Sequence, residues 1–385
     1  MEIYFDNSAT TRCYDSVRDV VVKTMMEDYG NPSSMHQKGV EGEQYLKDAR
    51  QIFAKILKVN EKEIYFTSGG TESNNWALVG TALANKRSGN RIISTAIEHP
   101  AVSEPLRFLE EQGFEIIKLG VDKNGQISLE ELEAALTDKT ILVSTMYVNN
   151  EIGAVQPVEE IARLVHRKCP GALYHVDAIQ AFGKYQIFPK RIGIDLMSAS
   201  GHKIHGPKGV GLMYMSEKAK VAPIILGGGQ QKGMRSGTDN VSGIAGFAQA
   251  AKEIYTDREA KNISLYELKE YMIEQLKTLD RVVVHGTTDR EKSAPHIINA
   301  SLVGVGSEVL LHTLEDRQIY VSAGSACSTH KRSKSPTLSA IDAKKEEMES
   351  SVRFSFTEEN TKEEVDTVIS VLKEVLPLLR RYRAH

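Results

Sequence analysis

Lys203 lies in a segment whose composition suits covalent chemistry with a carbonyl compound. The segment at 198–209 reads SerAlaSerGlyHisLysIleHisGlyProLysGly and follows an apolar, strand-like run. A lysine held among small residues and hydroxyls at a packed strand end is partly desolvated, so its amine is neutral often enough to form a Schiff base. The alternative, an ordinary surface lysine, suits Lys208 better than Lys203.

Two further segments could hold a ring nitrogen and a phosphate group. Asp177 ends a predicted strand, where a carboxylate could pair with a pyridinium nitrogen; a helix-capping aspartate is the alternative. The turn ThrSerGlyGlyThrGluSer at 67–73 could expose backbone N–H groups to a phosphate, although a glycine-rich turn without a ligand explains it equally well. A phosphate cradle, an acid for a ring nitrogen and a Schiff-base lysine, in that order on successive strand ends, together meet the needs of pyridoxal phosphate.

Short apolar runs alternate with helical patterns from about residue 60 to 215, which is typical of a parallel sheet covered by helices. The helices include one at 71–84 and one at 128–136, the second with the spacing of a capping box. We expect the strands at 64–67, 91–95, 114–119, 140–146, 172–176, 195–199 and 209–214.

A second domain is expected after the sequence changes character near residue 255. A charged helix at 257–279 leads to strands at 282–285, 297–301 and 351–356, and an amphipathic helix runs from 361 to about 380. We predict a large α/β domain at 15–255 and a small α+β domain formed by 1–14 and 256–385. Small and polar residues at 322–336 indicate a mobile loop.

Composition excludes several classes of protein. The chain has 385 residues, of which 41% are hydrophobic and 26% charged, and its net charge is -3. No run of about 18 apolar residues could span a bilayer, and nothing in the charge favours nucleic acid. The acidic start MEIYFDNSATT is unlike a leader, so we expect a cytoplasmic protein. The three cysteines are far apart and lack ligand spacing, which predicts neither a metal site nor a disulfide framework.

The chain resembles the cysteine desulfurases of the NifS/IscS type, which belong to the class V aminotransferase superfamily. The resemblance runs from TyrPheAspAsnSerAlaThrThr at 4–11 through GlyAsnProSerSer at 30–34 to SerValArgPheSerPhe at 351–356. SerGlyHisLysIleHisGlyProLysGly and ArgSerGlyThr are its most specific motifs. It implies fold type I: a mainly parallel seven-stranded sheet with helices on both faces, plus the smaller α+β domain.

The same resemblance implies roles for individual residues with pyridoxal phosphate as cofactor. Lys203 would form the Schiff base, Asp177 would pair with the ring nitrogen, Gln180 would donate to the ring hydroxyl and His99 would stack on the ring. The phosphate would be held by Gly70, Thr71, Ser200 and His202, with Thr238 reaching in from a second subunit of a homodimer. Asn150 would contact cofactor or substrate, but the sequence does not decide whether Asn149 or Asn150 faces inward.

Two residues would act on the substrate. Arg353 would bind its carboxylate, for which a two-pronged guanidinium is suited. Strand alternation places Arg353 on the opposite face from Val352 and Phe354, which argues against a surface ion pair.

Cys327 distinguishes sulfur transfer from amino transfer, which needs no thiol. The loop around Cys327 is as long as in the housekeeping and nitrogen-fixation desulfurases, and the basic residues at 331–334 favour a thiolate or dock a partner. Cys13 and Cys169 are given no role.

The sequence therefore predicts a cysteine desulfurase that converts L-cysteine to L-alanine with a persulfide on Cys327. The sulfur would pass to an acceptor protein of iron–sulfur cluster assembly, thio-cofactor synthesis or tRNA thiolation. Lys203 would remove the Cα proton and His99 would act as acid or base. The alternatives are a selenocysteine lyase, another class V enzyme, or a non-catalytic scaffold, which would have no need for a Schiff-base lysine.

Overall fold

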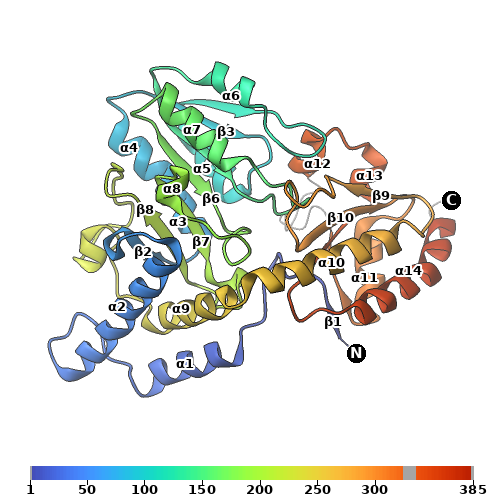
Figure 1. Ribbon diagram of the computed structural model, residues 1–385, viewed down its shortest axis with the longest axis horizontal. Coiled ribbons are helices and arrows are strands. Elements are labelled where there is room, and N and C mark those ends of the chain that lie inside the picture. The colour runs from blue at the N-terminus through green and yellow to red at the C-terminus, as the bar shows by residue number, and fades with distance from the viewer. Residues whose placement is uncertain (1, 324–334, 383–385) are drawn as a thin grey trace.

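The computed structural model describes residues 2–323 and 335–382. Its largest element is a seven-stranded sheet (Figure 1). The strands are β2 (Ile64–Thr67), β3 (Arg91–Thr95), β4 (Glu115–Leu119), β5 (Thr140–Met146), β6 (Leu173–Asp177), β7 (Leu196–Ser200) and β8 (Gly211–Met215). Their order is β2-β8-β7-β6-β5-β3-β4, and only β8 runs antiparallel to its neighbours. The predicted mainly parallel sheet is confirmed.

Helices cover both faces of this sheet because its strands are apolar on both sides. Ile93 of β3 packs in a cluster with Phe53 and Val165, whereas the adjacent Ile92 packs in a second cluster with Val102 and Leu106. The helices around the sheet are α1 (Asp15–Met26), α2 (Gln37–Leu57), α3 (Gly70–Asn75), α4 (Thr81–Asn85), α5 (Pro100–Glu111), α6 (Leu129–Ala135), α7 (Val158–Lys168), α8 (Pro189–Ile192) and α9 (Val241–Tyr255).

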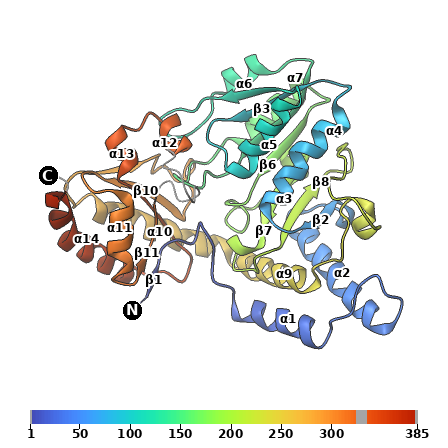
Figure 2. The same cartoon turned by 180° about the vertical axis from the view of Figure 1, so that it is seen from behind.

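A long helix, α10 (Arg258–Leu276), runs from this unit to a second group of elements (Figures 1 and 2). This group contains β9 (Val282–His285), β10 (Ile297–Leu302), β12 (Ser322–Ala323) and β13 (Ser351–Ser355), which form an antiparallel sheet in the order β12-β13-β10-β9. A separate pair joins β1 (Ile3–Tyr4) to β11 (Ile319–Tyr320). The remaining helices are α11 (Ser307–Glu315), α12 (Pro336–Ala340), α13 (Lys345–Glu349) and α14 (Lys362–Tyr382).

The second group has its own hydrophobic core, which includes the start of the chain. Ile3 and Phe5 pack with Phe354 and Leu372 in a cluster distinct from that of the large sheet. We propose on this basis the same two domains, 15–255 against 1–14 with 256–385. Within the described ranges, no helix is both long and apolar enough to cross a bilayer.

Two details differ from the sequence expectation. The helix expected at 71–84 contains a π-helical turn, Trp76–Gly80, between α3 and α4. There the Gly80 carbonyl accepts from the N–H of Ala222, and the Trp76 indole donates to the Ala222 carbonyl, so a neighbouring segment interrupts the helical ladder. The stretch 322–336, expected as a loop, begins in β12 and ends at the first residue of α12, while 324–334 lie outside the described residues.

Candidate active site

A cavity of about 510 Å³ brings most of the predicted site residues together. It lies at the carboxyl ends of β6 and β7, beside the first residues of α3 and α5, and its other wall comes from residues 6–9 and β13. Parallel strands direct their carboxyl ends to one edge of the sheet, which is where ligands of such folds bind. The predicted residues that line the cavity are Gly70, Thr71, His99, Asn150, Asp177, Gln180, Ser200, His202, Lys203 and Arg353.

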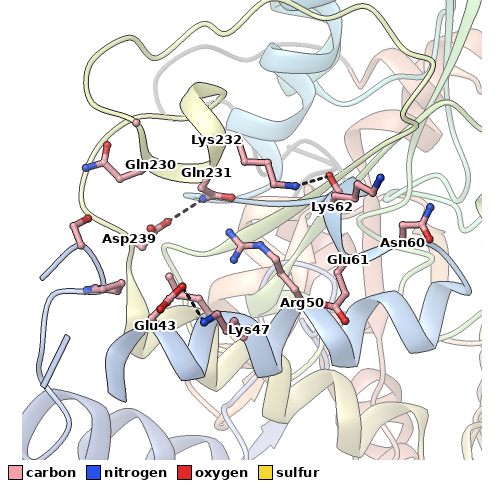
Figure 3. Close-up of a pocket in the computed structure, with 14 residues that line it drawn as sticks. Glu43, Lys47, Arg50, Asn60, Glu61, Lys62, Gln230, Gln231, Lys232 and Asp239 are labelled. Carbon is pink, nitrogen blue, oxygen red and sulfur yellow. Dashed lines mark hydrogen bonds and ion pairs between the residues drawn. The ribbon is translucent and has the colours of Figure 1, made fainter. Parts of the chain in front are cut away.

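A second cavity, of about 930 Å³, contains none of the predicted residues. It lies between α2 and the segment 229–232, and side chains of both charges line it, among them Arg50, Lys62 and Asp239 (Figure 3). Lys47 pairs with Glu43 in the same wall. Because most of the predicted residues gather in the first cavity and none lines this one, we place the candidate site in the first cavity.

The phosphate end of the first cavity is built from a close turn and a free hydroxyl. A Cβ atom at Gly70 would lie 2.1 Å from Cδ1 of Ile179, so a larger residue there would require the Ile179 side chain to move. Ser200 Oγ is buried and has no hydrogen-bond partner among the described residues, which is costly unless a ligand accepts from it. His202 adds a ring that burial and Lys203 keep neutral, with a pKa lowered to about 4. These groups fit a phosphate that accepts several hydrogen bonds.

Asp177 fits the ring nitrogen of pyridoxal phosphate. Its Oδ2 accepts from Asn74 Nδ2 at 2.7 Å and its Oδ1 from the N–H of Ile179 at 3.0 Å, which fixes the carboxylate at the end of β6. Burial raises the pKa of this carboxyl, so its ionised form calls for a cation nearby. A protonated pyridine nitrogen is such a cation. The residues present therefore fit the cofactor.

His99 has a defined orientation because it caps α5. Its Nδ1 accepts from the N–H of Ala101 at 3.1 Å, which leaves the proton of the neutral ring on Nε2. Burial lowers the pKa of His99 in spite of the nearby Asp177 carboxylate, and the ring is therefore neutral at pH 7. A neutral imidazole of this tautomer donates a proton from Nε2.

The N-terminal segment contacts both Lys203 and Gln180. Lys203 follows β7 in a short 3₁₀ turn, and its Nζ donates to the carbonyls of Ser8 at 2.5 Å and Ala9 at 2.9 Å. Gln180 Nε2 donates to the same Ser8 carbonyl at 3.0 Å, and its Oε1 lies 3.4 Å from His296 Nε2. Residues from both ends of the chain thus help to build the site.

Arg353 lies where strand alternation predicts. Val352 and Phe354 are buried in the core of the smaller unit, and Arg353 lines the cavity from the other face of β13. Asn150 also lines the cavity, whereas Asn149 is fully buried and donates to the carbonyl of Ile97. The choice that the sequence left open is thereby resolved geometrically in favour of Asn150.

One predicted residue does not line the cavity, and another lies outside the described residues. Thr238 is exposed and does not line the cavity of its own chain. Cys327 lies outside the described residues, but Ala323 and Ser335, which precede and follow the undescribed segment, both line the cavity.

Sequence reasoning missed three residues of the site. Asn74 lies one helical turn after Gly70, so i, i+4 spacing could have placed it on the same face. Glu98 lines the cavity next to His99 and has its pKa raised to about 8 by burial. Asp6, in the N-terminal motif, pairs with Arg353 at 2.8 Å. The partner of Asp6 is 347 positions away, and Glu98 accepts both from nearby Thr95 and from the distant N–H of Met146.

The fold and the site define a pyridoxal phosphate-dependent enzyme of fold type I. The family model described as Aminotransferase class-V matches residues 3–368, so the chain belongs to this family. Within it, the chain belongs to the NifS/IscS cysteine desulfurases. A NifS/IcsS protein homolog from Lactobacillus delbrueckii subsp. bulgaricus is 42% identical, over 97% of both chains.

A second relative and a solved structure support the same family. The putative cysteine desulfurase IscS 1 of Bacillus subtilis is 41% identical, over 98% of this chain and 99% of that protein. A solved structure described as a NifS-like protein superposes with a TM-score of 0.93 at 37% identity, over 98% of this chain and 100% of the other. The similarity therefore extends through both groups of elements.

Proposed function

We propose that this cysteine desulfurase transfers the sulfur of L-cysteine to the thiol of Cys327 and releases L-alanine. One observation supports the proposal above all: Arg353 and Lys203 line a single cavity, together with the residues that flank the segment containing Cys327. The reaction requires three groups: one that binds the substrate carboxylate, a reactive amine and a thiol.

The cofactor would be held by residues from several elements around the cavity. Gly70, Thr71, Ser200 and His202 would bind its phosphate, Asp177 its ring nitrogen, Gln180 its hydroxyl and His99 its ring face. When bound, pyridoxal phosphate withdraws electrons from the substrate Cα and so weakens the Cα–H bond. The protein would contribute the fixed charges around it.

The remaining groups would handle the substrate and its protons. Arg353 would bind the substrate carboxylate with its planar guanidinium. Lys203 Nζ would take the Cα proton, and His99 would donate a proton from Nε2, the nitrogen that its cap interaction leaves protonated. The Cys327 thiolate would attack the substrate sulfur, forming an S–S bond as the Cβ–S bond breaks and its electrons remain on the carbon fragment.

Replacing Cys327 with serine tests the proposal. The variant keeps all cavity residues, so it should bind cofactor and perturb its absorption on addition of cysteine, while alanine formation falls at least about 100-fold because the nucleophile is lost. Cys13→Ser is the matched control and should leave turnover unchanged. Alanine release by Cys327→Ser at the wild-type rate would contradict the proposal.

We also propose a homodimer in which Thr238 reaches the phosphate of the partner subunit. Thr238 is exposed and does not line the cavity of its own chain. Large apolar side chains are exposed on and between α1 and α2, namely Val22, Met25, Met26, Tyr29, Met35 and Val40. Large exposed apolar side chains within one stretch of the chain, residues 22–40, support a subunit interface there.

The acceptor of the sulfur would be a cluster scaffold or a thiolation protein. Membership of the cysteine desulfurase family supports a protein acceptor of this general kind. Capture of acceptors by the persulfide form, with Cys327→Ser as the control, identifies which one binds.

A further inference from the structure

The guanidinium of Arg353 is held from two sides. Its Nη1 donates to the Asn150 carbonyl at 2.8 Å, and its Nη2 donates to Asp6 Oδ1 at 2.8 Å. The Arg353 side chain is only 10% exposed, and both it and Asp6 line the cavity. Each terminal nitrogen carries two protons, and its partner takes one, so each nitrogen keeps a proton for a further acceptor.

Asp6 is itself fixed against the strand that carries Arg353. It forms a β-bridge with Ser355, two residues after Arg353 on β13. The N–H of Asn7 donates to the Ser355 carbonyl at 3.3 Å, and the N–H of Ser8 donates to Ser355 Oγ at 2.8 Å. The carboxylate and the guanidinium therefore come from two paired segments in a set register.

We infer that Asp6 is a positioning residue for substrate recognition. Together with the Asn150 carbonyl, it fixes the Arg353 guanidinium in the orientation that binds the substrate carboxylate. The inference rests on the proposed role of Arg353. An arginine side chain loses much rotamer freedom when it binds, and a guanidinium that is oriented beforehand avoids that cost at the moment of binding. Two-pronged recognition also fails when the plane of the fork is tilted.

Asp6→Ala removes the contact, and Asp6→Asn keeps an acceptor oxygen without the charge. We expect Asp6→Ala to raise the KM for L-cysteine about tenfold, with kcat within about twofold of wild type. Asp6→Asn should recover most of the loss. Glu115→Ala is the matched control, because it breaks a carboxylate–guanidinium bond of the same 2.8 Å length, to Arg91, outside the cavity.

A binding readout separates positioning from a general structural effect. L-Alanine, followed through the absorption of the bound cofactor, should bind Asp6→Ala about tenfold more weakly, whereas ethylamine, which lacks the carboxylate, should bind as to wild type. Cofactor content and melting temperature report on folding. An unchanged or lower KM, an equal loss with ethylamine, or an Asn variant as impaired as the Ala variant would each overturn the inference.

Arg353→Ala distinguishes the inference from the proposed function. If Arg353→Ala weakens alanine binding and Asp6→Ala does not, Arg353 binds the carboxylate without help from Asp6, and only the inference fails. If Arg353→Ala also leaves alanine binding unchanged, the proposed role of Arg353 fails as well.

Discussion

At the scale of single residues, the cavity contains ionisable groups whose charged forms burial disfavours. Burial raises the pKa of Asp177 and raises that of Glu98 to about 8, while it lowers the pKa of His99. The Nδ2 of Asn74 donates to Asp177, whereas the Oδ1 of Asn74 is buried and has no hydrogen-bond partner within the described residues. The buried Asp177 carboxylate therefore lacks full stabilisation from the protein alone, and a cationic ring nitrogen would stabilise its charged form.

Asp177→Asn should separate stability from function. The amide of Asn74 can turn so that its unpartnered Oδ1 accepts from the new side-chain amide, so the variant keeps its hydrogen bonds and loses a buried charge. We expect the cofactor-free protein to melt at the same or a higher temperature, and cofactor affinity and turnover to fall about 100-fold. A cofactor titration followed by absorbance measures the affinity, and alanine release measures the turnover. Undiminished affinity would argue against Asp177 as the partner of the ring nitrogen.

At the scale of elements, side chains between strands fix the sheet edge that carries the site. His175 of β6 is fully buried, two residues before Asp177. Its Nδ1 lies 2.8 Å from Ser144 Oγ on β5, and its Nε2 lies 3.0 Å from Ser198 Oγ on β7. Three adjacent parallel strands are thus tied together just below the cavity.

This arrangement predicts a pH dependence of stability. Burial lowers the pKa of His175 to about 3, whereas the imidazole of an unfolded chain titrates near 6.5. The unfolded state therefore binds more protons between these values, and the stabilisation present above pH 6.5 is lost as the pH falls toward 3, by up to about 1.4 kcal/mol per pH unit.

His175→Asn should flatten this dependence of the unfolding free energy between pH 4 and 6.5, although it lowers stability at pH 7 by about 1–3 kcal/mol. Urea unfolding at a series of pH values measures both effects. His312→Asn, on exposed α11, is the control and should leave the slope as in wild type. An unchanged slope in His175→Asn would show that this imidazole does not titrate as expected.

At the scale of the whole molecule, the smaller unit and the large sheet meet at the cavity. Arg353 comes from β13, Lys203 from the end of β7, and residues 6–9 lie against both. The proposed substrate site would thereby be linked to both ends of the chain. In the proposed dimer, the exposed Thr238 would extend the same principle to a second subunit.

Subunit mixing tests the shared site. Lys203→Ala and Thr238→Asp should each be inactive as pure proteins, the second because a carboxylate repels the cofactor phosphate. A mixed dimer contains one site with both changes and one wild-type site, so unfolding and refolding an equal mixture should restore about a quarter of wild-type activity. Mixing two Lys203→Ala preparations is the control. Absence of recovery in dimers of confirmed mixed composition would place Thr238 outside the partner's site.

The sequence by itself determined the parts whose signals are local. Apolar runs placed the seven strands of the large sheet within two residues of their bounds, because burial on both faces leaves a continuous apolar pattern. The positions of Asp177 and Lys203 after such runs placed them at one sheet edge. Alternation placed Arg353 on the opposite face from Val352 and Phe354, and in the structure that face lines the cavity. Their roles came from the resemblance of the surrounding motifs to a known family.

Only the tertiary structure decided which distant residues meet. Asn149 and Asn150 are adjacent residues of the same type, so the sequence does not decide between them. The turn after β5 directs Asn150 to the cavity and Asn149 toward Ile97. Asp6 reaches Arg353 across 347 positions of the chain because the N-terminal segment pairs with β13. A side chain's partners depend on such long-range pairing, and neither periodicity nor spacing along the chain contains that information.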